Sequence, residues 1–109
     1  MAETYCIILT TTGSLEEAAR LAELLVSHRL AACVQFFPIT SCYHWQGKIQ
    51  KESEYLLFVK TAAQLYSDVE KTILENHSYE IPEIIQIPID RGLELYLGWM
   101  DESLHHAEI

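Results

Sequence analysis

The feature that most constrains the fold of this chain is the order in which its hydrophobic pattern changes period. Stretches rich in β-branched and aromatic residues, typical of buried strands, alternate with stretches whose apolar residues recur every three or four positions, as in amphipathic helices. The pattern predicts strands at residues 5–11, 31–37, 41–45, 53–60 and 83–89, and helices at residues 15–30, 62–76 and 93–104.

Residues 31–37 and 41–45 are predicted to be one strand interrupted at Pro38. Proline cannot donate a hydrogen bond to a strand ladder, so it marks an edge or a bulge. Residues 46–48 supply a turn, and residues 53–60 form the return strand. Together these segments make a long antiparallel hairpin.

Two helix starts carry the spacing of a capping box, in which Ser or Thr is followed three residues later by Glu or Gln. The pairs are Ser14 with Glu17 and Thr61 with Gln64. In this motif the hydroxyl accepts a hydrogen bond from the later backbone N–H, and the longer side chain reaches back. The first two helices are therefore predicted to begin at these pairs.

The resulting order, β-α-β-β-α-β with a terminal helix, predicts an α+β fold of the ferredoxin-like type, with two right-handed crossovers. We expect the 109 residues to form a single domain, residues 1–109. In the strand at residues 5–11, alternate side chains point to opposite faces of the sheet, and both sets include apolar residues. Because the elements are too few to cover both faces, we expect the chain to associate with copies of itself.

Charge excludes one large class of partner. The chain has 16 acidic and 7 basic residues, a net charge of −9, and its lysines and arginines are scattered. Nucleic-acid binding needs clustered positive charge, so no nucleic-acid partner is expected. No apolar run approaches the ~20 residues that span a bilayer, and Met1–Thr4 lack the positive region of a signal peptide. We therefore expect a soluble, cytoplasmic protein with no membrane partner.

The three cysteines do not form a disulfide framework or a zinc-knuckle pattern, because their number is odd and no CxxC pair occurs. Cys6 and Cys33 lie in apolar runs and are expected to pack as small hydrophobes. Cys42 lies in a more polar stretch and is the candidate reactive thiol. His105 and His106, near the end of the chain, are expected to be exposed residues that bind metal only adventitiously.

The sequence contains no dinucleotide-binding or P-loop fingerprint, no HExxH and no GxSxG. A denser polar group combines aromatic rings, a lysine, histidines and carboxylates, as polar pockets do. The alternative is that the aromatic residues anchor the core and the charges are solvated. The group consists of Tyr43, His44, Trp45, Lys60, His77, Tyr79, Glu80 and Glu83.

At these residues the sequence resembles the CutA (divalent-cation tolerance) family. The resemblance runs from about Tyr5 to Glu102, and the order and spacing of its blocks make it more specific than any single motif. The blocks are RLAACV at residues 29–34 with Pro38, SCYHWQGKI at 41–49, KT at 60–61, HSYEIPEII at 77–85 and YLGW at 96–99.

The resemblance implies a tight homotrimer of ferredoxin-like subunits, similar in architecture to PII-type signalling proteins, whose long hairpins complete sheets on neighbouring subunits. It implies a link to tolerance of copper and other divalent cations. It also places the site in a cleft between subunits. The matching ligand-cleft positions are Tyr43, Trp45, Glu54, Lys60 and Tyr79, and the matching metal positions are His77 and Glu83.

Two positions depart from the pattern. Some family members carry Cys where this chain has Thr10, and His where it has Asn76, and those groups are associated with copper. Hydroxyl and amide groups are poor copper ligands. The expected ion, copper or zinc, therefore depends on His77 and Glu83.

The resemblance and the residues together predict a trimeric binding or sensing module for divalent cations, without catalysis. One alternative is a PII-like trimer that binds a small molecule or has a structural role. The other is an enzyme that uses Lys60 with Glu54 or His77 as acid and base.

Overall fold

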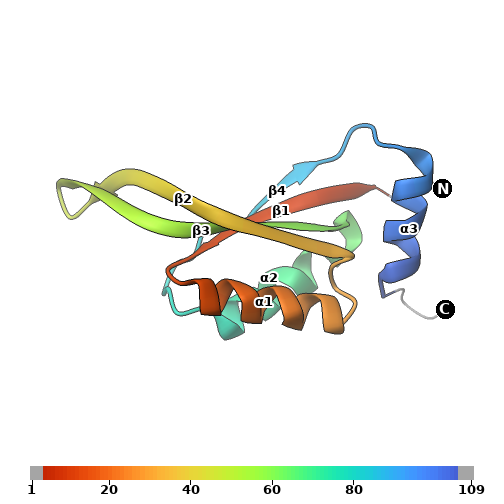
Figure 1. Cartoon of the computed structure of the whole chain (residues 1–109), viewed down its shortest axis with the longest axis horizontal. Coiled ribbons are helices and arrows are strands. Elements are labelled where there is room, and N and C mark those ends of the chain that lie inside the picture. Colours follow the sequence, from red (N-terminus) through yellow and green to blue (C-terminus); the bar gives the residue numbers. More distant parts are fainter. Residues whose placement is uncertain (1–3, 106–109) are drawn as a thin grey trace.

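A computed structural model describes residues 4–105, so the predictions made for residues 1–3 and for His106 lie outside the described residues. The elements follow the predicted order with one added 3₁₀ helix, η1 (Figure 1). They are β1 (Tyr5–Thr12), α1 (Leu15–Ser27), β2 (Cys33–Trp45), β3 (Lys48–Ala62), η1 (Ala63–Leu65), α2 (Tyr66–Asn76), β4 (Ile85–Pro88) and α3 (Glu94–Ser103).

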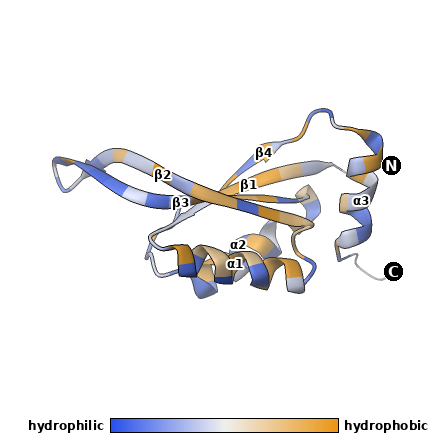
Figure 2. Ribbon diagram, in the orientation of Figure 1, coloured by the Kyte–Doolittle hydropathy of each residue, from blue (hydrophilic) through white to orange (hydrophobic). Residues whose placement is uncertain are grey.

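The four strands form one antiparallel sheet in the order β2-β3-β1-β4. Helices α1 and α2 cover one face of it, and α3 lies at the end of the sheet away from the hairpin turn (Figure 1). This is the predicted ferredoxin-like α+β arrangement. In Figure 2 orange, hydrophobic segments run along the middle of the sheet, while the outer part of the hairpin is largely blue and white.

The β2–β3 hairpin is longer and more regular than predicted. Pro38 lies inside a continuous β2 and is paired with Tyr55. The sheet tolerates it because β2 is an edge strand, the place in a sheet where proline is accommodated. At the tip, Gln46 and Gly47 both have positive φ, 50° and 77°. Such a two-residue turn matches the twist of the flanking strands and sets the register of the whole ribbon.

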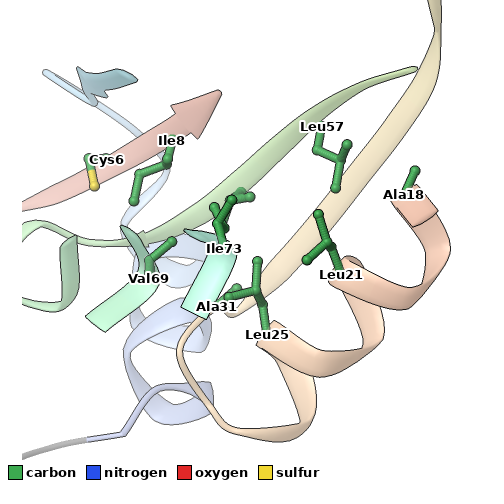
Figure 3. Packing of buried hydrophobic residues seen from close by; sticks show 10 residues of the cluster. Cys6, Ile8, Ala18, Leu21, Leu25, Ala31, Leu57, Val69 and Ile73 are labelled. Atoms are coloured by element: carbon green, nitrogen blue, oxygen red, sulfur yellow. The ribbon is translucent and has the colours of Figure 1, made fainter. Parts of the chain in front are cut away.

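The main core lies between the sheet and the two covering helices (Figure 3). Its largest fully buried side chains come from all four elements that meet there: Ile8 on β1, Leu57 on β3, Leu21 and Leu25 on α1, and Ile73 on α2. The predicted apolar stripe of the first helix is thus confirmed. None of the described helices is long and apolar enough to cross a membrane.

The first helix ends at Ser27, not near Leu30 as predicted. Arg29 takes the left-handed conformation, with φ of 57°, and its N–H donates to the carbonyl of Val26. The Leu30 N–H donates to the carbonyl of Leu25. This is a Schellman motif, which usually carries glycine at the left-handed position. The end of this helix could not be recognised from the sequence, because arginine occupies the position where glycine would have marked it.

The prediction of a capping box at Thr61 and Gln64 is wrong. Thr61 is buried in β3, and its hydroxyl donates to the carbonyl of Leu30 at 2.6 Å. β3 continues through Ala62 because its residues 55–62 pair with β1. η1 intervenes, and α2 starts at Tyr66 without a side-chain cap.

The last helix contributes less to the core than its apolar content suggests. Of its large apolar and aromatic residues Leu95, Tyr96, Trp99 and Met100, only Met100 is buried, in a second cluster with Leu65 and Leu104. Leu95, Tyr96 and Trp99 are exposed in the chain as described. Their apolar surface is therefore available for contacts outside this fold.

Candidate functional site

A cleft of about 570 Å³ opens between the outer part of the β2–β3 hairpin, the end of β1 and the segment that joins α2 to β4. It contains five of the predicted site residues but neither Lys60 nor His77. The lining residues are Thr11, Tyr43, Trp45, Glu52, Glu54, Tyr79, Glu80, Ile81 and Glu83.

Strand register explains why the hairpin residues meet in this cleft. Side chains two apart on a strand share a face, and the β2–β3 pairing puts Glu52 and Glu54 on the same face as Tyr43 and Trp45. Leu57 belongs to the other face, where it packs beneath the helices. The cleft therefore lies on the sheet face that α1 and α2 leave uncovered, which we call the open face.

Tyr79 anchors the joining segment to the hairpin. Its hydroxyl donates to Oε2 of Glu54 at 2.8 Å, and Glu54 is only 7% exposed. Burial, that hydrogen bond and the neighbouring negative charges raise the pKa of Tyr79 well above its usual range. Gly13 allows the approach, because a Cβ there would lie 3.2 Å from the tyrosine oxygen.

The cleft is acidic. Four carboxylates line it, from Glu52, Glu54, Glu80 and Glu83, and no lysine or arginine is among its lining residues. A hydrogen bond to Glu52 is the main cause that raises the pKa of Tyr43. Both cleft tyrosines therefore stay neutral at physiological pH, and the net charge of the lining is negative.

His77 supports the cleft from behind, with its side chain fully buried. Its Nδ1 accepts the backbone N–H of Tyr79 at 2.9 Å, so that nitrogen carries no proton. Its Nε2 therefore holds the proton and donates to the carbonyl of Thr11 at 2.6 Å. Both ring nitrogens are occupied by protein partners, so in this arrangement His77 has no lone pair left for a metal ion.

Glu17 ties the same segment to α1. Its two carboxylate oxygens accept the backbone N–H and the hydroxyl of Ser78, each at 2.8 Å, and one of them lies 3.4 Å from Nδ1 of His77. Burial alone would raise the pKa of Glu17, but the two hydrogen bonds from Ser78, together with the charge of Arg20, outweigh it and hold that pKa below its usual value.

The predicted capping box at Ser14 is therefore only half formed. The Ser14 hydroxyl accepts the N–H of Glu17 at 3.1 Å, as expected. The Glu17 carboxylate does not reach back along its own helix, because Ser78 takes both of its oxygens. Its role in positioning the cleft had no local sequence signal, since the partners are 61 residues apart.

Lys60 does not reach the cleft. It lies on β3 toward α3, with its Nζ 3.3 Å from the hydroxyl of Tyr96 and 5.4 Å from the centroid of that ring. Its place in a cleft between subunits stays a prediction about the assembly. Within one chain, the lysine and the carboxylates of the cleft occupy separate sites.

The two positions that depart from the family pattern lie outside the cleft lining. The Thr10 side chain is buried on the helix-covered face, and its hydroxyl has no hydrogen-bond partner among the described residues. Asn76 donates to the carbonyl of Thr72 at 2.8 Å. Residues 4–105 contain no group of three or more His, Cys, Asp or Glu side chains placed to hold a metal ion.

Three lining residues were missed: Thr11, Glu52 and Ile81. Glu52 could have been found, because it stands two residues before Glu54 on the same strand and so shares its face. Thr11 and Ile81 carried no signal, since they reach the cleft only through the contact between the end of β1 and the joining segment.

Comparison with known proteins gives a consistent match. Residues 6–103 match the family described as CutA1 divalent ion tolerance protein. The chain belongs to the CutA1 family. It is 44% identical to the divalent-cation tolerance protein CutA of Archaeoglobus fulgidus, over 89% of this chain and 95% of that one. It is also 39% identical to the chloroplastic CutA protein of Arabidopsis thaliana. That match covers 89% of this chain but only 54% of the Arabidopsis protein.

The fold agrees with this assignment. The solved structure of CutA1 from Oryza sativa superposes with a TM-score of 0.94 at 36% identity, covering 96% of this chain and 97% of that one. The matched CutA1 segment includes every residue that lines the cleft. The recognised family thus extends over the candidate site as well as the core.

Proposed function

We propose that this chain forms a homotrimer that binds divalent cations, copper or zinc first among them, as a binding or sensing module without catalysis. The observation that carries the proposal is the lining of the cleft, with four carboxylates and no basic side chain. A cleft lined by one sign of charge concentrates ions of the opposite sign. The tolerance to divalent ions named in the family description is in keeping with such a site.

The trimer is supported by the open face of the sheet, which carries apolar side chains on every strand. Contiguous exposed apolar surface on a globular chain commonly marks an association site. The number of three copies is taken from the family resemblance. The residues on this face include Ile7, Leu9, Cys33, Phe37, Leu56, Phe58, Ile85 and Ile87.

The cleft opens on the same face. A neighbouring copy that covers the apolar residues would therefore also border the cleft, which gives binding and assembly a physical connection. This supports a site that is completed by association, as the resemblance implies.

The enzymatic alternative gains little support. It needs Lys60 beside Glu54 or His77, but Lys60 contacts Tyr96 and both nitrogens of His77 are engaged by backbone groups. The small-molecule alternative has a specific observation in its favour, the size of the cleft, and it is developed below.

The proposal is tested by two measurements on the full chain. Light scattering at micromolar concentration should give a mass near three chains. Calorimetry with copper(II) and with zinc should show uptake that falls in Glu54→Gln and Glu83→Gln but not in Glu23→Gln, a matched loss of one exposed carboxylate on α1. Cys42→Ser should have little effect, because a carboxylate cleft does not depend on that thiol.

Two results would contradict the proposal. A stable monomer would remove the assembly and the site that depends on it. If deletion of the tail that carries His105 and His106 abolished uptake while the cleft variants titrated normally, the metal site would be the tail. The predicted cytoplasmic location is checked separately by fractionation of the native cells, because one relative is named chloroplastic and one solved relative periplasmic.

A further inference from the structure

The cleft is much larger than a bare metal ion requires. Its volume of about 570 Å³ falls within the range of pockets that hold small organic molecules. A divalent transition metal instead needs several ligand atoms within ~2.0–2.3 Å of one point. No such group of three occurs among residues 4–105. Within one chain, the cleft has the charge expected for a cation but the dimensions of a site for a molecule.

Aromatic rings form a second part of the lining. Tyr43, Trp45 and Tyr79 border the cleft together with the carboxylates. The face of an aromatic ring attracts organic cations, tryptophan most strongly, and rings combined with acidic groups recognise alkylammonium ions. A small metal ion gains little from such rings, because it keeps its shell of water or oxygen ligands.

Glu54 gives the cleft a buried charged group with spare bonding capacity. Only 7% of the residue is exposed, and its Oε2 accepts a hydrogen bond from the Tyr79 hydroxyl. Its other oxygen, Oε1, receives no hydrogen bond from any described residue and lies in a residue that lines the cleft. Thr10 Oγ1 is the only buried side-chain oxygen or nitrogen without a partner among the described residues, so Oε1 of Glu54 is accessible from the cleft. Its negative charge is therefore open to a cationic ligand.

We propose that the cleft binds an organic cation through an alkylammonium group, with its charge beside Glu54 and its carbon substituents against Trp45 and Tyr43. The inference rests on the proposed function, because it names the class of cation that the same acidic cleft takes. The inference differs from the proposed function in requiring both the carboxylates and the faces of the aromatic rings.

Calorimetry on the full chain can separate charge from shape. The probes are choline and its uncharged isostere 3,3-dimethylbutan-1-ol, which has a nearly identical shape. Choline should bind at least about tenfold more tightly than the isostere. Spermidine, with several ammonium groups, tests whether the four carboxylates favour a polyvalent chain. Tighter binding of spermidine than choline would identify the polyamine form of the same class, and the reverse would identify the quaternary form.

Two variants test the named groups. Glu54→Gln keeps the size of the side chain and should weaken choline or spermidine binding about tenfold, while Glu23→Gln should leave it unchanged. Trp45→Leu keeps apolar bulk but removes the ring, and should weaken choline binding severalfold. Light scattering on each variant, at a protein concentration high enough for complete assembly, checks that wild type and variant are compared in the same oligomeric state. A Trp45→Leu protein that assembles and binds choline normally would overturn the role of the ring.

The inference and the proposed function can fail separately. Equal binding of choline and its isostere would overturn the inference. So would a trimer that takes up copper or zinc at the cleft but neither choline nor spermidine, and in that case the proposed function would stand. Binding of choline by a stable monomer would support the inference and overturn the trimer.

Discussion

The two faces of the sheet are built from the same strands, yet they differ in how completely the chain covers them. On the helix-covered face Ile8, Leu57 and Val59 are fully buried. On the open face Phe37 and Ile87 remain 43% and 45% exposed, although they are equally apolar. Covering one face takes both α1 and α2, and α3 lies at the end of the sheet (Figure 1).

The difference separates two kinds of stability. Burial on the helix-covered face is complete within one chain, so it contributes whenever the chain folds. Burial on the open face can be completed only by another molecule, so it depends on concentration. The following predictions test this difference, in order of decreasing effect.

The adjacent residues Leu56 and Leu57 provide a matched pair, because they point to opposite faces. Leu57→Ala should lower the free energy of unfolding by about 3 kcal/mol, the usual cost of a cavity in a core. Leu56→Ala should act mainly on assembly, so its effect should grow on dilution. Thermal unfolding at two protein concentrations measures both. If the two variants showed the same concentration dependence, the distinction between the faces would be wrong.

Trp45 tests how far the open face extends along the hairpin. Large aromatic residues carry a disproportionate share of interface energy, so Trp45→Ala should weaken the trimer by about 2 kcal/mol. The side chain is 58% exposed in the single chain, so folding of the subunit should be unaffected. Light scattering across a dilution series measures the change. An unaltered dissociation midpoint would make Trp45 an ordinary surface residue.

Glu17 tests the support that the helix-covered side gives to the cleft. Glu17→Gln should cost about 1.5 kcal/mol, because its two hydrogen bonds from Ser78 go to a charged acceptor. The pKa of Glu17 is lower in the folded chain than its usual value of 4.5. Its ionised form therefore stabilises the fold above about pH 4.5, and that contribution is lost as pH falls through the lowered folded pKa.

Thermal unfolding of wild type and Glu17→Gln as a function of pH checks this. The difference should be full near pH 7 and should shrink in acid. Glu23→Gln, on the same helix but exposed, should match the wild type throughout. A pH-independent difference would mean that the carboxylate charge is not what holds Ser78.

Tyr79 is expected to show the smallest effect. Tyr79→Phe removes the hydrogen bond to Glu54 but keeps the ring, and should cost about 1 kcal/mol. Since folding raises the pKa of Tyr79, the contribution of its neutral hydroxyl should be constant below about pH 10 and decline only above that. Denaturant unfolding measures the cost, and Tyr66→Phe serves as a tyrosine control that lies outside the cleft lining. A loss of several kcal/mol would show that the Tyr79 hydroxyl contributes more to stability than this one hydrogen bond.

The sequence alone determined the order of the elements and the side chains that can share a strand face. Period-two and period-3.6 patterns are local, so β1, α1 and the hairpin were recognisable from nearby residues. The same periodicity placed Tyr43 with Trp45 and would have placed Glu52 with Glu54. The expectation that both sheet faces carry apolar groups was confirmed for the same reason.

The tertiary structure decided which of these residues act together. The Glu17 carboxylate accepts two hydrogen bonds from Ser78 because folding brings α1 beside the segment that follows α2. His77, a predicted metal ligand, is instead held by groups from that segment and from β1. Lys60 and Glu54 lie on the same strand but at different sites. β3 is long enough to reach from the cleft, where Glu54 lies, to Tyr96, which Lys60 contacts. Hydrogen bonds and burial depend on partners distant in sequence, and local patterns carry no information about them.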